Sequence, residues 1–252
     1  MRARDRARHT QIVLVVDHYV PQPDRDAGSR TMLCCIHALQ QAGAIVKFWP
    51  HNQCYSPGYT EALQDMGVEV AYGGGDTAIG EWLAQNGRDI DYALLSRPQV
   101  ASACIPILRQ HGDMPLLYYG HDLHFQRMRQ QAEMQGSTRL AHDANRMERS
   151  ERAVWRAVDI ALYPSGDEAA IVTELEPSAM AGVLLPYCFR DFGTRRTPAA
   201  EPVLLFVGGF APSCRPGNSA TIASMTPGRK LAADTFRLAH EEIPARVESI
   251  VE

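Results

Sequence analysis

The sequence Val13-Leu-Val-Val-Asp-His-Tyr-Val-Pro-Gln-Pro-Asp-Arg-Asp-Ala-Gly-Ser-Arg30 joins an apolar run to a turn marked by proline and glycine, and then to a segment with helical character. Ile12 to Val16 has no polar interruption and is rich in β-branched residues, which is typical of a parallel strand buried on both faces. Ser29 is a favourable N-cap residue after flexible Gly28, so we expect the backbone N–H groups from Arg30 onward to point toward the strand's carboxyl end. Open α/β sheets bind ligands at that edge. The stretch therefore predicts a ligand turn, although a plain connecting turn with solvated side chains fits the same residues.

Composition narrows the class of protein. The 252 residues are 45% hydrophobic, which is enough for one large domain or two modest ones with a sizeable core. A net charge of −4 gives no basic field for nucleic acid, and the arginines within residues 1–10 indicate a flexible, solvated basic tail. The sequence has no segment of signal-peptide type and no apolar run of the ~18 residues that span a membrane. We therefore expect a cytoplasmic protein without a transmembrane segment.

The cysteines do not form a recognisable site. Six cysteines are scattered along the chain without a C-x-x-C pair. This spacing argues against a zinc site and against a disulfide framework. Most of them are expected to be small core residues, and no metal is expected.

Strand and helix signals alternate along the chain. Further strands are expected at Ala44–Trp49, Val68–Ala71, Ile90–Leu95, Pro115–Tyr119, Asp159–Tyr163 and Val183–Tyr187. Helices are expected at Arg30–Gln41, Tyr59–Met66, Ala78–Gln85, Val100–Arg109, Leu123–Glu133, Thr138–Ala157 and from a capping box at Ser165–Glu168. The alternation predicts an α/β fold for residues 11–190, with a doubly wound, mostly parallel, Rossmann-like sheet.

The turn after the fifth expected strand is rich in reactive side chains. Gly120-His-Asp-Leu-His-Phe125 places two imidazoles and a carboxylate within four residues. These groups could bind a metal, act as an acid/base pair or hydrogen-bond a polyol. Metal binding is the least favoured because no further His or Cys cluster completes a ligand set. In another interpretation, Asp122 caps the following helix and His124 packs beneath it.

Charged side chains recur along the predicted helix Thr138–Ala157. Some fall at a spacing of four residues, for example Glu148 and Arg152. Such pairs lie on one side of a helix. The pattern indicates a solvated face rather than a site.

The composition changes near the C-terminus. Residues 191–202 carry charge, glycine and proline, as an interdomain linker does. The apolar run Val203–Val207 then ends in Gly208-Gly209, like the opening of a second α/β domain. Only about 45 residues follow, whereas a full domain needs ~100 or more. Residues 203–252 are therefore expected to be the remnant of a second domain, with a Pro/Ser-rich segment and at most one amphipathic helix, Lys230–Glu252.

Several motifs, in this order, carry a resemblance to a known family. They are Val16-Asp-His-Tyr-Val-Pro21, Asp24-Arg-Asp-Ala-Gly-Ser-Arg30, Leu95-Ser-Arg-Pro98, Tyr119-Gly-His-Asp-Leu-His-Phe125, Glu148 to Ala157, and Phe206-Val-Gly-Gly-Phe210. Together they resemble the N-terminal half of retaining glycosyltransferases of the GT-B fold, in the group-1 or family-4 class. The resemblance covers about residues 11 to 210.

The resemblance implies two Rossmann-like domains, the first holding mostly the acceptor and the second mostly the nucleotide sugar. The implied partners are a nucleotide-sugar donor and a glycan or lipid-linked acceptor, with no metal or other cofactor. It implies that His121 contacts the transferred sugar, and we expect Asp122 to act at the same sugar. The implied binding residues are Gly28, Ser29 and Arg30 near the donor phosphates, Asp24, Arg97 and His124 as acceptor-side or supporting groups, and Gly208 and Gly209 in the second domain.

The sequence departs from the family after Phe210. The second domain's basic phosphate-contacting pair and its Glu-x7-Glu motif have no match there, so the donor domain is expected to be truncated and catalysis to be incomplete or dependent on a protein partner. The alternative function is a non-catalytic glycan-binding or partner-docking protein with the same fold. A dinucleotide-dependent dehydrogenase is disfavoured because no G-x-G-x-x-G follows the first strand.

Overall fold

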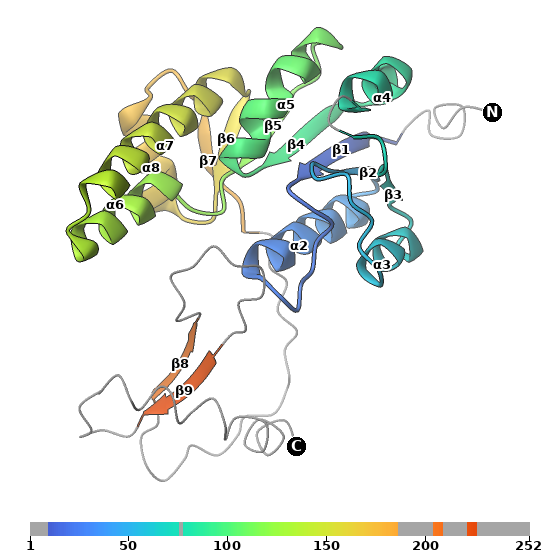
Figure 1. The fold of residues 1–252 in the computed structure, drawn as a ribbon. Coiled ribbons are helices and arrows are strands. Elements are labelled where there is room, and N and C mark those ends of the chain that lie inside the picture. The colour runs from blue at the N-terminus through green and yellow to red at the C-terminus, as the bar shows by residue number, and fades with distance from the viewer. Residues whose placement is uncertain (1–9, 76–77, 186–203, 209–220, 226–252) are drawn as a thin grey trace. The chain divides into compact units, whose positions relative to one another are not determined.

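The computed structural model describes residues 10–75, 78–185, 204–208 and 221–225 (Figure 1). The contacts divide the chain into two units, one formed by Met1–Pro23 with Gly28–Cys188 and the other by Asp24–Ala27 with Phe189–Glu252. They are called the first and the second unit, and each is described by itself. The predicted linker at 191–202, Gly209 and the predicted helix Lys230–Glu252 lie outside the described residues, as does almost all of the predicted tail at 1–10.

The first unit contains a sheet of seven parallel strands within the described residues, in the order β3-β2-β1-β4-β5-β6-β7. Their bounds are β1 Ile12–Asp17, β2 Ile45–Pro50, β3 Glu69–Val70, β4 Tyr92–Ser96, β5 Leu116–Tyr119, β6 Ile160–Tyr163 and β7 Ala181–Val183. The predicted α/β, doubly wound fold is confirmed. The strand order runs in opposite directions on either side of the β1–β4 pair, which makes the carboxyl edge of these two strands a topological switch point.

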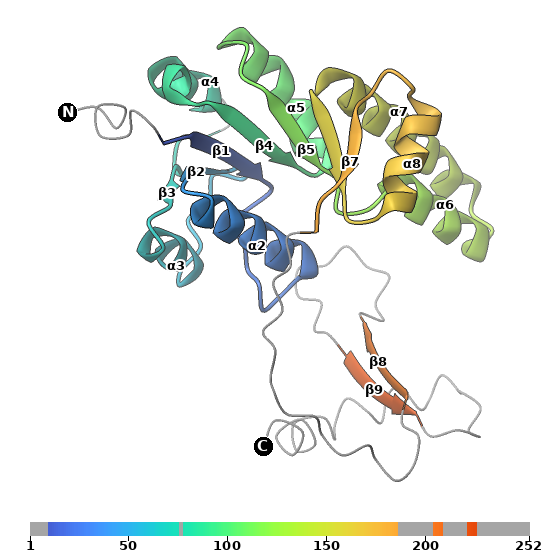
Figure 2. The same ribbon diagram turned by 180° about the vertical axis from the view of Figure 1, so that it is seen from behind.

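Helices cover both faces of the sheet, as Figures 1 and 2 show. Their bounds are α2 Ala27–Gln41, α3 Tyr59–Asp65, α4 Ala78–Asn86, α5 Pro98–Gln110, α6 His124–Gln135, α7 Thr138–Ala157 and α8 Gly166–Leu175, with a 3-10 turn, η1, at Gly87–Asp89. Side chains of α2 and α3 pack on one face. Side chains of α4, α5, α6, α7 and α8 pack on the other. This division is expected when right-handed crossovers run in both directions from a central strand.

Each residue of strand β1 is buried, because helices cover both faces of the sheet at this strand. Val13 and Val15 pack with Met32 of α2 on one face, whereas Leu14 and Val16 belong to the core of the other face. Burying one such side chain contributes roughly 1.5–3 kcal/mol. The unbroken apolar run predicted from the sequence therefore serves two cores at once.

Helices α6 and α7 form a hairpin that supports the turn after β5. Gly136 ends α6 in the left-handed conformation with φ of 59°. The Ser137 hydroxyl then accepts a hydrogen bond from the Leu140 N–H at 3.3 Å and caps α7. The hairpin brings Trp155 of α7 against Phe125, with their rings 6.5 Å apart.

The first helix begins three residues earlier than predicted. Helix α2 starts at Ala27, so the prediction that Ser29 is its N-cap is wrong; Ser29 lies in the first turn and is buried. Asp26 occupies the position before the helix, and aspartate is one of the favoured residues there. The N–H groups that begin the helix are those of Ala27, Gly28 and Ser29 rather than those from Arg30 onward.

Two further predictions change in the structure. The seventh strand is Ala181–Val183, not Val183–Tyr187, because the ladder with β6 is formed by the residues opposite Ala161, Leu162 and Tyr163. The other elements differ from prediction by one or two residues at their ends, which is the usual uncertainty of element boundaries. The capping box of α8 is confirmed: the Ser165 hydroxyl accepts from the Glu168 N–H at 3.2 Å.

In the second unit the structure describes two strands. Strand β8, Leu204–Gly208, pairs antiparallel with β9, Thr221–Met225. The sequence analysis did not predict β9, since the surrounding residues 211–228 are rich in proline, serine and glycine. The division of the chain into domains remains a prediction.

Among the described residues, no helix is both long and apolar enough to cross a lipid bilayer.

Candidate functional site

Three adjacent strands bring polar residues together at the carboxyl edge of the sheet. Asp17 ends β1, Ser96 ends β4 and Tyr119 ends β5. Ser96 and Tyr119 are register partners in neighbouring strands. The residues that follow these strand ends therefore meet at the switch point, which is where open α/β sheets bind ligands.

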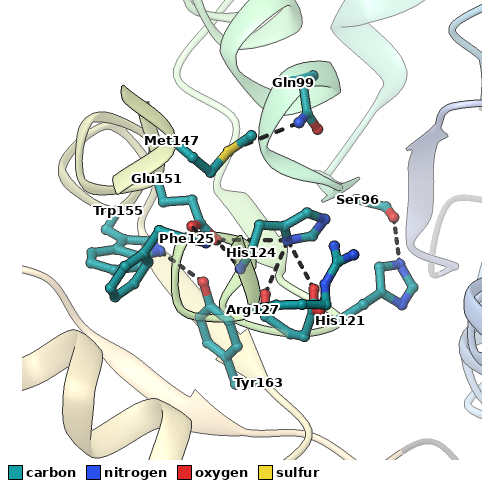
Figure 3. A network of polar contacts seen from close by, with 11 residues as sticks. Ser96, Gln99, His121, His124, Phe125, Arg127, Met147, Glu151, Trp155 and Tyr163 are labelled. Atoms are coloured by element: carbon teal, nitrogen blue, oxygen red, sulfur yellow. Dashed lines mark hydrogen bonds and ion pairs between the residues drawn. The ribbon is translucent and has the colours of Figure 1, made fainter. Parts of the chain in front are cut away.

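His121 lies at this edge and is held by β4. Its Nε2 atom shares a hydrogen bond of 2.8 Å with the hydroxyl of Ser96, as Figure 3 shows. Its ring also meets the Tyr119 ring edge-on, with centroids 5.1 Å apart. Burial is the main cause that lowers the pKa of His121 to about 4; the charge of Asp17 opposes this shift and that of Arg97 adds to it. The imidazole is therefore neutral near pH 7.

A buried ion pair stands beside His121. The guanidinium Nε of Arg97 lies 3.0 Å from the Asp17 carboxylate, and the Asp17 side chain is only 3% exposed. The same carboxylate oxygen accepts a hydrogen bond from the His18 N–H at 2.7 Å. The Arg97 guanidinium also lies 5.7 Å from the centre of the Tyr19 ring. We call Asp17, Ser96, Arg97 and His121 the His121 site.

The backbone at Arg97 is strained. Its φ is 67°, a conformation that side-chain-bearing residues rarely adopt. Pro98 follows at the first helical position of α5, where proline is favoured. Strained residues of this kind cluster at ligand sites, because the surrounding fold must hold them in place.

The Asp122 side chain pairs with side chains that follow it closely in the sequence. Its carboxylate pairs with His124 Nδ1 at 2.9 Å and with Arg127 Nε at 2.7 Å. Burial would raise the pKa of Asp122, but the hydrogen bond from His124 and the charges of His124 and Arg127 lower it to about 2. The interpretation of Asp122 as the cap of α6 is wrong, since the N-cap position is Leu123 and no side chain of the turn caps the helix.

Glu151 takes the capping role from another helix, and the sequence analysis missed it. This residue of α7 is fully buried. Its carboxylate accepts the N–H of His124 at 3.2 Å and the N–H of Phe125 at 2.9 Å (Figure 3). Burial raises the pKa of Glu151 to about 7, although the two backbone hydrogen bonds oppose the shift. It lies on the same face of α7 as Val154, Ala144 and Trp155, so a carboxylate on an apolar helical stripe was the available signal.

The predicted pairing of charges along the solvated face of α7 is wrong. Glu148 pairs with Arg129 of α6 instead of Arg152. Arg152 lies 3.5 Å from Glu176, beyond the end of α8. These charges join neighbouring elements because α7 packs against both of them.

The structure gathers only part of the predicted site. His121 and Arg97 lie together, and His124 is linked to Asp122 in the same turn. In the first turn of α2, Gly28 is half-buried and Arg30 is exposed. The remaining predicted residues lie elsewhere: Asp24 is exposed in the turn before α2, Gly208 ends β8 of the second unit, and Gly209 is outside the described residues.

In the part of the chain that the structure describes, no three His, Cys, Asp or Glu side chains gather closely enough to hold a metal ion.

No model of a known protein family matches this sequence, and no curated protein matches it. The function of the His121 site must therefore be argued from its own chemistry.

Proposed function

We propose that this chain is a glycosyltransferase-like protein of the retaining GT-B class, built for sugar transfer from a nucleotide-sugar donor to a glycan or lipid-linked acceptor, whose catalysis is incomplete or depends on a protein partner that supplies the donor domain. The observation that carries the proposal is the neutral His121, held by Ser96 at the switch point between β1 and β4. The fold and the motif order of the sequence support the same function. Neither a metal nor another cofactor takes part in the proposed reaction.

His121 binds the transferred sugar through its second ring nitrogen. Nε2 is engaged by Ser96, which leaves Nδ1 for a hydroxyl of the sugar. A neutral imidazole can accept or donate that hydrogen bond according to its tautomer. Because it carries no charge, it adds no repulsion as positive charge develops at the anomeric carbon.

The Asp17–Arg97 pair holds the wall of this site in place. The carboxylate neutralises the guanidinium at 3.0 Å and ties β1 to the start of α5. Asp122, ionised and paired with His124 and Arg127, fixes the turn that carries His121. We assign Asp122 a positioning role in the proposed reaction, since its oxygens are engaged by its neighbours.

The start of α2 favours the donor phosphates. A helix N-terminus attracts negative charge through its dipole. The exposed guanidinium of Arg30 lies in the first turn of this helix and would add charge-assisted hydrogen bonds. Together they would stabilise a nucleoside diphosphate as it leaves.

Calorimetric titration of the full chain with nucleotide sugars tests the proposal. The probes are UDP-glucose, UDP-N-acetylglucosamine and GDP-mannose, each compared with its nucleoside diphosphate alone. We expect one sugar nucleotide to bind more tightly than its diphosphate. Because His121 contacts the sugar, His121→Ala should weaken binding of that sugar nucleotide about tenfold and leave diphosphate binding unchanged.

His142→Ala is the matched control, since His142 is an exposed histidine of α7. It should bind both ligands as the wild type does. The proposal fails if no sugar nucleotide binds, or if His121→Ala retains the wild-type preference for the sugar. If glycans bind to the chain but none of the sugar nucleotides does, the non-catalytic glycan-binding function is favoured instead.

A further inference from the structure

A hollow of about 480 Å³ lies along β3 at the edge of the sheet, and none of its lining residues belongs to the His121 site. Figure 1 shows β3 at this edge. The hollow is lined by residues from the ends of β2 and β3, the loops after them, and helices α3 and α4. We call it the edge hollow, and its residues used below are Trp49, Gln64, Tyr72, Glu81, Trp82 and Gln85.

Aromatic rings form part of its wall, and other aromatic rings pack against them. The half-buried Trp82 packs against the buried Trp49, with ring centroids 5.5 Å apart. The ammonium of Lys47 lies 5.7 Å from the Trp82 ring. Tyr72 is 42% exposed and packs against Tyr55 at 5.4 Å. Rings held in this way offer apolar contact area with little loss of conformational entropy on binding.

Polar groups converge on the same space. The side chains of Gln64, Glu81 and Gln85 line the hollow, and within the described residues none of them has a hydrogen-bond partner. The backbone of edge strand β3 adds another pair of groups. Ala71 N–H donates to Phe48 at 2.9 Å, so the N–H and C=O of the preceding Val70 point away from β2, toward the open edge.

The loops that frame the hollow are held in place by one side chain. Gln53 adopts a positive φ of 53°. Its amide donates to the Pro50 carbonyl at 2.8 Å and accepts from the Gly74 N–H at 3.2 Å. The loop after β2 is thereby tied to the loop after β3, and the hollow is largely preformed.

The charge of the lining disfavours anionic ligands. Lys47 is engaged by Glu69, while Glu81 places a carboxylate in the lining. Nucleotides and other anions would be repelled. Strand β3 has two residues, too few to pair with an added peptide strand. An uncharged ligand with apolar faces and many hydroxyls can use both the aromatic rings and the amide and carboxylate groups of this lining.

We propose that the edge hollow binds a neutral pyranose unit of a glycan. The ring's C–H face packs on Tyr72 and Trp82, and its hydroxyls bond to Gln64, Glu81, Gln85 and the Val70 backbone. The lining is more polar than apolar and combines aromatic rings with several amide and carboxyl groups, and a pyranose likewise combines apolar C–H faces with hydroxyls. The identification of this glycan as the acceptor rests on the proposed function, whereas the binding itself does not.

The test is titration of the full chain with cellohexaose, maltohexaose and the β-1,4-linked hexamer of N-acetylglucosamine. Tryptophan emission reports binding because Trp49 and Trp82 line the hollow, and calorimetry confirms it. We expect at least one hexamer to bind. Gln85→Ala and Tyr72→Ala should each weaken that binding about tenfold, since both residues are exposed enough for the variants to fold.

Gln130→Ala, at an exposed glutamine of α6, is the matched control and should bind as the wild type does. The inference is overturned if none of the three hexamers binds, or if Gln85→Ala and Tyr72→Ala both retain wild-type affinity. His121→Ala should leave hexamer binding unchanged. If the wild type binds a hexamer but no sugar nucleotide, the proposed function alone is overturned. If it binds a sugar nucleotide but no hexamer, this inference alone is overturned.

Discussion

His121 owes its chemical character to its burial at a strand end. In an unfolded chain its pKa is near 6.5, and in the folded chain burial lowers the pKa to about 4. Because the folded state disfavours the protonated ring, the contribution of His121 to stability is complete above pH 6.5. That contribution is lost as the pH falls through 4.

This linkage predicts the pH dependence of one variant. Between pH 6.5 and pH 4, the free energy of unfolding of the wild type should fall relative to that of His121→Ala by at most about 3 kcal/mol. Urea unfolding followed by tryptophan emission measures it, since the three tryptophans, Trp49, Trp82 and Trp155, all lie in the first unit. A constant difference across this range would contradict the buried, neutral state of the ring.

Glu151 should act in the opposite direction. Burial raises its pKa to about 7, so its contribution to stability is complete below pH 4.5 and is lost as the pH rises through 7. The free energy of unfolding therefore loses the His121 contribution as the pH falls and the Glu151 contribution as the pH rises. The effects of His121 and Glu151 are separated by comparing the free energy of unfolding of a variant of each residue with that of the wild type across this pH range.

At the scale of elements, the end of β5 is the most constrained point near the site. A Cβ atom on Gly120 would lie 2.5 Å from ring atoms of Tyr163. That tyrosine is fully buried, and its hydroxyl accepts a hydrogen bond from the Trp155 indole at 2.9 Å. The ring cannot move without disturbing β6 and α7 together.

Gly120→Ala should therefore destabilise the first unit by about 1–3 kcal/mol. Gly166→Ala is the control, because a Cβ there meets nothing within 4 Å. In the first turn of α8 it should stabilise by about 0.4–1 kcal/mol. Denaturant unfolding compares the two. Equal stability of both variants would show that Tyr163 yields more easily than the packing indicates.

At the scale of the whole molecule, the cysteines report on global opening. Cys35 and Cys104 are buried in the cores of opposite faces of the sheet. Burial raises the pKa of Cys35 to about 12 and that of Cys104 to about 11. Cys54 is exposed in the loop after β2. Only the thiolate reacts readily with alkylating agents. Burial therefore protects Cys35 and Cys104 in two ways, because it blocks access to the sulfur and keeps the thiol protonated.

Alkylation of the native chain with iodoacetamide, mapped by peptide mass spectrometry, should modify Cys54 before Cys35 and Cys104. Cys35 and Cys104 should react only as fast as the first unit unfolds, and both should react faster when stability is lowered by urea. Modification of either buried thiol at the rate of Cys54 would contradict a core closed on that face.

The sequence by itself determined the fold of the first unit. Apolar runs such as Ile12–Val16 can be satisfied only between two layers of helices, and their alternation with helical segments implies a parallel sheet. Local signals also determined the capping box of α8. The bounds of β7 and the start of α2 were harder to predict, because several neighbouring residues fit the beginning of each element equally well.

The site was only half predictable. His121 was singled out because its turn follows a strand, and Arg97 was named with the family motifs; the strand ends of a parallel sheet share an edge, which brings the two together. Their partners depended on the tertiary structure: Asp17 is 80 residues from Arg97, and Ser96 is 25 residues from His121. Which strand ends become neighbours is decided by strand order. How far a side chain's pKa shifts is decided by burial, which no local pattern encodes. Tertiary packing alone placed Glu151 beneath the turn and made His121 neutral.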